Sequence, residues 1–154
     1  MFRHFRSRDA LIAAVWPCMQ TRVRSAGFPR TANDLIATPL RLFPEFDKEE
    51  KLVRASAFSA AGREVRRAAN RERQEAMRAC VRNAFPRLAE PELTRLAAVV
   101  QLIDSAYGWA VMKEHWGLDG HEAGLAASQA LAVLLGRRPA GPPPRNKARE
   151  ERPK

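Results

Sequence analysis

Two histidines and three acidic residues lie close together in the sequence near a predicted turn. His115 and His121 bracket this turn, and Glu114, Asp119 and Glu122 are their neighbours. Side chains of these types can bind metal ions or transfer protons. Their spacing matches no zinc motif, however, and is typical of a solvated turn. We therefore predict no metal site and no cofactor.

The cysteines and short motifs also give no sign of an active site. Cys18 and Cys80 are far apart and show no CxxC or Cys/His spacing. We expect both to be small core residues. The alternative role of a redox sensor would require an exposed thiol of low pKa. The chain has no GxGxxG, no phosphate-binding loop, no GxSxG and no paired nucleophile and base. The prediction is that this protein is not an enzyme.

Positive charge is concentrated at the two ends of the chain. The 154 residues include 27 Lys plus Arg and 17 Asp plus Glu, a net charge of +10. Residues 1–30 carry six Arg and one Asp, and residues 137–154 carry seven Lys or Arg and two Glu, so each end contributes +5. Residues 31–136 are neutral. A basic surface for nucleic acid is therefore expected only at the ends.

The composition indicates a helical globular protein. Hydrophobic residues make up 45% and charged residues 29% of the chain, which excludes disorder over most of its length. Alanine occurs 27 times, whereas Val, Ile and Thr together occur 16 times, and this balance favours helices over strands. The basic start is followed by an apolar stretch without a signal-type cleavage site. We expect a cytoplasmic protein.

The apolar spacing predicts an all-α fold of about six helices. Capping residues mark four of the starts, namely Ser7, Thr31, Asp47 and Asp119. Prolines inside the first two helices should bend them. The stretch 63–75 should be a charged, solvated half-helix. The predicted helices cover about 8–25, 31–43, 47–62, 63–85, 91–116 and 119–136.

The last two predicted helices are apolar on more than one side. Thirteen of the seventeen residues from Leu96 to Met112 are apolar, but the stretch is too short and interrupted for a membrane span. A twofold dimer would cover this surface with a four-helix interface. The alternative is that the earlier helices cover both within one chain. The expected interface residues are Ala127, Ser128, Ala130, Leu131, Leu134 and Leu135.

The chain begins with the pattern Phe2-Arg3-His4-Phe5, followed by a turn, Arg8 and an apolar helix. This pattern resembles the end of the recognition helix in the tetracycline-repressor (TetR) family of bacterial regulators. The segment 96–135, with its Trp116-Gly117-Leu118 turn and Ala-rich final helix, also looks like the end of that family's ligand-binding domain. The two similarities together span most of residues 1–136.

The resemblance implies DNA contacts at Phe2, His4 and Arg8. Phe2 stands where the family usually has a phosphate-binding Tyr, and its alternative role is packing against the first helix. The resemblance also implies that residues 1–7 are the end of a helix-turn-helix and that residues 8–136 form a ligand-binding and dimerisation domain. Most of the DNA reader would then be missing, because of an upstream start codon or a truncated gene. Residues 137–154, rich in Pro, are expected to be a disordered basic tail.

In the TetR family the second domain encloses a mainly apolar pocket. Asp104 lies among apolar residues and is therefore paired, exposed at a helix edge, or placed for a ligand. Ordinary core packing is the alternative for the other candidates. Pro17 is either a fixed bend or a hinge between reader and body. The expected lining residues are Trp16, Met19, Phe43, Met77, Asp104, Tyr107 and Met112.

The resulting functional hypothesis is a TetR-like repressor that forms a homodimer, senses an unknown apolar small molecule and, with a complete reader, binds operator DNA. It requires no membrane. One alternative is a dimerising helical interaction protein without a ligand, which would show no stabilisation by apolar compounds. Another is a nonspecific basic nucleic-acid binder, which would show steeply salt-dependent binding to any duplex.

Overall fold

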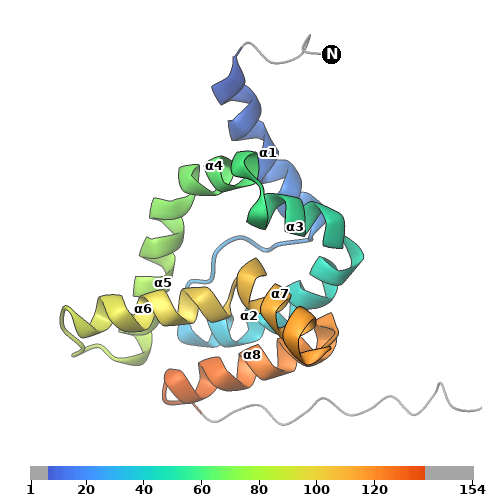
Figure 1. Ribbon diagram of the computed structural model, residues 1–154. Helices are drawn as coiled ribbons and strands as arrows, with labels where there is room; N and C mark the ends of the chain where they lie inside the picture. Colours follow the sequence, from blue (N-terminus) through green and yellow to red (C-terminus); the bar gives the residue numbers. More distant parts are fainter. Residues whose placement is uncertain (1–6, 138–154) are drawn as a thin grey trace, which may run out of the picture.

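The computed structural model describes residues 7–137, and these contain eight α-helices and no strand (Figure 1). The predicted all-α class is confirmed, although the helices are more numerous than expected and, apart from α2, shorter. Their bounds are α1 (Arg8–Arg22), α2 (Ala32–Lys48), α3 (Glu50–Phe58), α4 (Ala60–Ala68), α5 (Asn70–Ala84), α6 (Glu92–Ile103), α7 (Ala106–Trp116) and α8 (Gly120–Leu134).

Three of the predicted N-caps are confirmed. The side chain of Ser7 accepts a hydrogen bond from the amide of Ala10, and that of Asp119 accepts one from Glu122. Thr31 and Asp34 form the reciprocal capping box at the start of α2. Each cap provides an acceptor for an amide that has no partner in the first turn of its helix.

The fourth predicted cap is wrong, because α2 does not stop before Asp47. It continues through Pro39 and Pro44 to Lys48, so Asp47 lies in its last turn. The two prolines remove two intrahelical hydrogen bonds. Packing against α8 compensates, since α2 and α8 form the most extensive helix pair of the described fold.

Two predicted helices are each divided in the structure. The stretch 63–85 breaks at Ala69, because α4 packs on α1 whereas α5 packs on α6. The stretch 91–116 breaks at Asp104 and Ser105, and the Ser105 hydroxyl accepts a hydrogen bond from the amide of Gly108 to start α7. In the second case both halves contact α8, but α6 packs mainly on α5 whereas α7 also packs on α3. Tertiary packing therefore overrides a continuous helical pattern.

Small residues of α8 allow its backbone to approach that of α2. A Cβ atom on Gly120 would lie 2.4 Å from the carbonyl oxygen of Phe43, and one on Gly124 would lie 2.7 Å from that of Pro39. Further along α8, Ala127 and Leu131 are fully buried. Close helix contact of the kind expected between two subunits therefore occurs within one chain.

The helices surround an interior that is crossed by the segment between α1 and α2 (Figure 1). One apolar cluster joins α2, α5, α6 and α8, and a second joins α2, α3, α7 and α8. The N-terminal end of α1 projects from this body. Within residues 7–137, no helix combines the length and apolar character needed to cross a membrane.

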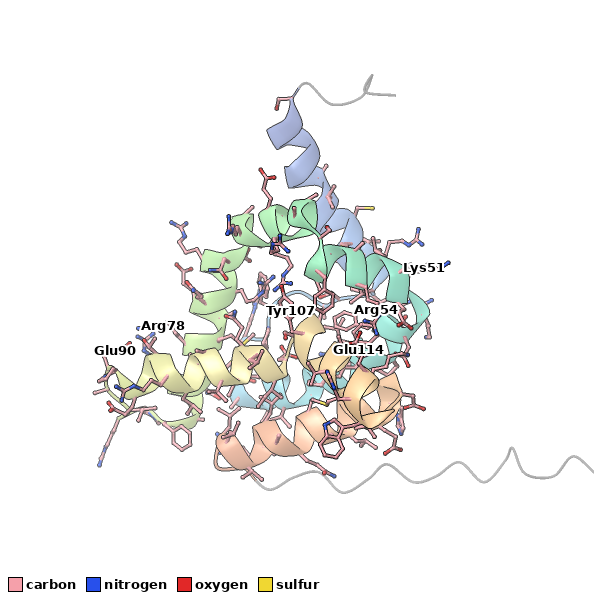
Figure 2. All side chains as sticks on the ribbon, viewed as in Figure 1. Lys51, Arg54, Arg78, Glu90, Tyr107 and Glu114 are labelled. Carbon is pink, nitrogen blue, oxygen red and sulfur yellow. The ribbon has the colours of Figure 1, made fainter. Side chains whose placement is uncertain are left out.

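Ion pairs at the periphery connect neighbouring helices. Figure 2 shows Arg78 beside Glu90 at one end of α6, and Arg54 beside Glu114 near α7. Exposed pairs of this kind contribute little to stability because water screens them. They lie between neighbouring helices at the edge of the fold and do not contribute polar groups to the interior.

Candidate ligand-binding site

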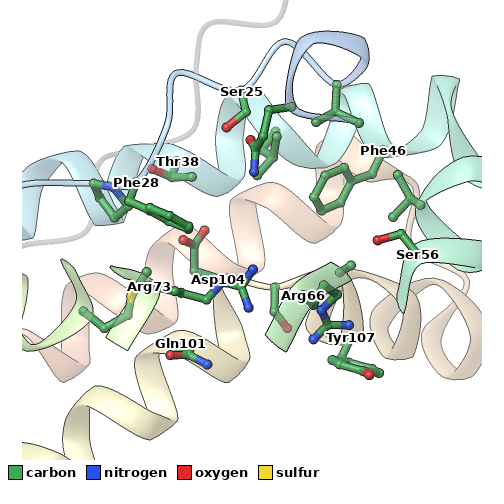
Figure 3. Close-up of a pocket in the computed structure, with 18 of the residues that line it drawn as sticks. Ser25, Phe28, Thr38, Phe46, Ser56, Arg66, Arg73, Gln101, Asp104 and Tyr107 are labelled. Carbon is green, nitrogen blue, oxygen red and sulfur yellow. The ribbon is translucent and has the colours of Figure 1, made fainter. Parts of the chain in front are cut away.

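A cavity of about 370 Å³ lies inside the ring of helices (Figure 3). Seven of the eight helices, α1 to α7, contribute lining residues. The segment 23–29 contributes further lining residues. Apolar side chains make up much of its wall, among them Met19, Leu42 and Phe46. A mainly apolar cavity of this size with a few polar groups is typical of small-molecule sites.

Four of the seven predicted lining residues face this cavity, namely Met19, Met77, Asp104 and Tyr107. Phe43 is fully buried in the second core cluster, and Met112 packs against the same cluster; neither lines the cavity. For these two residues the alternative of ordinary core packing is the better description. The side chain of Trp16 lies outside the described part of the chain.

Asp104 is positioned by the break between α6 and α7. Its amide still donates to the carbonyl of Val100, but its side chain no longer belongs to a regular helix and turns into the cavity, toward Phe28 (Figure 3). The Oδ1 atom is buried and has no hydrogen-bond partner among the described residues. Burial raises the pKa of Asp104 well above its ordinary value, and the attraction of Arg73 only partly opposes this. The carboxyl group therefore favours its protonated form more than an exposed Asp does.

Arg66 and Tyr107 form a second polar group on the cavity wall. The guanidinium of Arg66 lies 4.4 Å from the centre of the Tyr107 ring and donates to the carbonyl of Ala57 at 3.3 Å. The Tyr107 hydroxyl donates to the same carbonyl at 2.7 Å. These contacts hold α4 and α7 against the end of α3, so both side chains have a defined orientation.

Arg73 approaches the cavity from α5. Its guanidinium lies 5.7 Å from the centre of the Phe28 ring. Burial lowers the pKa of Arg73, repulsion from Arg66 lowers it further, and attraction by Asp104 opposes both. The two guanidinium groups are thus near enough to influence each other across the same interior.

Sequence reasoning missed Arg66, Arg73 and Phe28 as lining residues. The stretch 63–75 was expected to be solvated, but Val65 and Ala69 are buried and the two arginines reach the cavity. A signal was present in the order of residues, because Val65, Ala69 and Met77 recur at helical spacing among the charges. The division into α4 and α5 concealed the face that they share.

His115, His121, Cys18 and Cys80 do not line the cavity. His115 and His121 are exposed, and no group of His, Cys, Asp and Glu within residues 7–137 is arranged to hold a metal ion. Cys80 is fully buried, and burial raises the pKa of its thiol to about 12, as fits a core residue. The expectation of a core position for Cys18 is wrong, because that side chain is exposed.

The six residues predicted for the dimer interface have different positions in the structure. Ala127, Ser128, Leu131 and Leu135 are buried within the chain, whereas Ala130 is exposed and Leu134 is half-buried. The predicted DNA-contact residues Phe2 and His4, the side chain of Arg8 and the tail from residue 138 lie outside the described residues.

No protein-family model matches the sequence, and neither the curated proteins nor the solved structures contain a significant match.

Proposed function

We propose that residues 8–136 form the ligand-sensing and dimerising domain of a TetR-like transcriptional regulator, a repressor. The observation that supports this most is the cavity of about 370 Å³ with the unpartnered Oδ1 of Asp104 in its wall. Protein interiors are normally close-packed, and an unpartnered buried polar atom is costly. Both features are explained if a small molecule occupies the cavity during function.

The position of α1 fits the same proposal. Its C-terminal half contributes Met19 and Gln20 to the cavity wall, and its N-terminal end projects from the body (Figure 1). The segment that resembles the end of a recognition helix precedes α1 in the sequence. A ligand in the cavity would touch α1, the helix that leads to the DNA-binding element. If α1 has two arrangements, a ligand that binds one of them more tightly shifts the equilibrium toward it.

Filling the cavity is expected to abolish ligand binding. Ser56 is half-buried on α3 and lines the cavity, whereas Ala55 on the same helix is exposed. In thermal-shift measurements with a panel of apolar compounds, the unaltered chain should be stabilised by several compounds. Ser56→Phe should lose these shifts, and Ala55→Phe should retain them. Equal shifts in both variants would place binding elsewhere.

The regulatory part of the proposal requires DNA. The protein is expressed from the longest open reading frame that contains this chain in frame. In a gel-shift assay it should retard DNA from the region upstream of its own gene. A compound that stabilises the chain should change that retardation. If retardation is absent, or is indifferent to every stabilising compound, the regulator proposal fails.

A dimerising protein without a ligand is the second candidate. It is favoured by the exposed apolar side chains: of seven large ones in the described residues, five lie on α6, α7 and α8. These five are Val99, Leu102, Val111, Trp116 and Val133. Scattered exposed apolar residues are ordinary, but such residues on three helices that contact one another are compatible with a subunit interface. This candidate predicts dimers and no thermal shift.

A charged side chain introduced at an exposed apolar position of α6, α7 or α8 is expected to weaken dimerisation. Val133 and Val111 are 67% and 50% exposed, so a Glu at either position should not disturb the monomer. In sedimentation experiments the unaltered chain should be dimeric, and Val133→Glu or Val111→Glu should shift it toward monomer by at least about tenfold in Kd. Val15→Glu, at an exposed apolar position on α1, is the matched control. Dissociation by Val15→Glu alone would place the interface elsewhere.

A further inference from the structure

The described lining of the cavity carries more positive than negative charge. Arg66 and Arg73 contribute two guanidinium groups, and Asp104 contributes one carboxyl group. Repulsion by Arg66 helps to lower the pKa of Arg73, and the attraction of Asp104 is the smaller effect. Two like charges beside one partly apolar cavity repel each other, and an anion placed between them would relieve that repulsion. The charge pattern therefore selects against a cationic ligand.

The two guanidinium groups are held in a way that suits a carboxylate. Each lies near an aromatic ring, Arg66 at 4.4 Å from the Tyr107 centroid and Arg73 at 5.7 Å from the Phe28 centroid. A guanidinium carries several N–H donors, so Arg66 has others besides the one that it gives to the carbonyl of Ala57. The paired donors along a guanidinium edge match the two oxygens of a carboxylate. Figure 3 shows both arginines and Asp104 around the same cavity.

We propose that the ligand is an amphipathic organic acid whose carboxylate is bound by Arg66 and Arg73. The apolar body of the ligand lies along Met19, Phe46 and Leu102. This inference rests on the proposed ligand-sensing function and specifies the chemical class of the ligand.

Asp104 adds a hydrogen-bond donor to this arrangement. When protonated, its carboxyl group can donate to a ligand oxygen, which gives a partner to a group that lacks one at Oδ1. Burial favours this form by raising the pKa of Asp104. An ionised Asp104 would repel the acid, so an amide at this position should support binding at least equally well.

The charge preference of the cavity is tested with three naphthalene probes that carry different substituents at the same ring position. They are naphthoate, naphthamide and naphthylmethylammonium, and their binding to the full chain is measured by isothermal titration calorimetry. Naphthoate should bind at least about tenfold more tightly than naphthamide, because a hydrogen bond to a charged group is stronger than a neutral one. The ammonium probe should bind most weakly.

Substitutions of the cavity-lining residues test whether Arg66, Arg73 and Asp104 cause the preference for a carboxylate. Arg73→Gln and Arg66→Gln should each weaken naphthoate binding about tenfold and leave naphthamide binding within about twofold. Asp104→Asn should leave naphthoate binding equal or tighter. Arg67→Gln, at an exposed position next to Arg66, is the matched control and should change neither probe.

The possible outcomes separate this inference from the function on which it rests. Equal affinity for naphthoate and naphthamide, or tightest binding of the ammonium, overturns the acid but leaves a ligand pocket. Binding of none of the three overturns both. Should Arg73→Gln also lose naphthamide, the fold has changed, and Arg66→Gln then decides. An unchanged naphthoate affinity in Arg66→Gln overturns the proposal.

Discussion

Gly120→Ala is expected to lower the free energy of unfolding by about 2 kcal/mol, the range found when a packed interior receives an extra methyl group. The new Cβ would lie 2.4 Å from the carbonyl oxygen of Phe43, 2.7 Å from its carbonyl carbon and 2.9 Å from the Cα of Pro44. All three are backbone atoms, so no side chain can turn aside. The helices α2 and α8 would have to separate along their largest contact.

The direction of the change in unfolding free energy shows whether the position is tightly packed, because Gly→Ala at an open helical position raises that free energy by up to about 1 kcal/mol. Urea unfolding should give a lower midpoint for Gly120→Ala and also for Gly124→Ala, whose Cβ would meet the carbonyl oxygen of Pro39 at 2.7 Å. Ala130→Gly, at an exposed position of α8, is the control and should cost only the ordinary propensity, about 1 kcal/mol. A stabilised Gly120→Ala would mean that α8 does not pack this closely on α2.

Asp47→Ala is expected to cost about 3 kcal/mol, because one carboxylate serves three donors from two other parts of the fold. It accepts from the indole of Trp109 at 2.9 Å, from the ammonium of Lys113 at 2.9 Å and from the amide of Gly120 at 2.6 Å. Trp109 is fully buried, so removing Asp47 takes the acceptor away from a buried N–H. Losing hydrogen bonds to a charged acceptor and leaving a buried donor unsatisfied both contribute to the loss.

Asp47 should also make stability depend on pH. Burial alone would raise the pKa of Asp47, but the hydrogen bonds from Lys113, Gly120 and Trp109 outweigh it and the net change is a lower pKa. A carboxyl group whose pKa is lower in the folded chain stabilises it above the unfolded pKa, near pH 4. That contribution disappears as the pH falls through the folded pKa.

Unfolding in urea at pH 7 and pH 3 separates the charge of Asp47 from its shape. The unaltered chain should lose more stability between these values than Asp47→Asn, which retains one acceptor and cannot ionise. Asp47→Ala should be the least stable of the three at pH 7. Glu75→Gln, on an exposed residue 3.7 Å from Arg71, is the control and should follow the unaltered chain. An identical pH response in Asp47→Asn would show that other carboxyl groups dominate acid unfolding.

Asp47 also shows why part of the fold was predictable and part was not. In the sequence it precedes Glu50 by three residues, a local pattern that indicates an N-cap. In the structure α2 extends over it, and its carboxylate binds donors more than sixty residues away. A capping pattern contains no information about a donor from another helix, so the prediction failed at the residue where a long-range contact was strongest.

The cavity residues divide in the same way. Met19, Met77 and Tyr107 could be chosen because large adaptable side chains on apolar helix faces suit a pocket wall. Arg66 and Arg73 were not chosen, since arginines in a charged stretch are normally solvated. They reach the interior because α4 and α5 meet at Ala69 and enclose it together with the segment that carries Phe28.

The sequence by itself determined the helical class, three of the helix starts and the turn at Gly117, whose φ of 66° suits a residue without a side chain. Each of these follows from hydrogen bonds or steric limits within a few residues. The tertiary structure decided where two helical patterns divide, which helix covers the small residues of α8, and which polar groups face the cavity. These depend on contacts between segments distant in sequence, whose energies no local pattern contains.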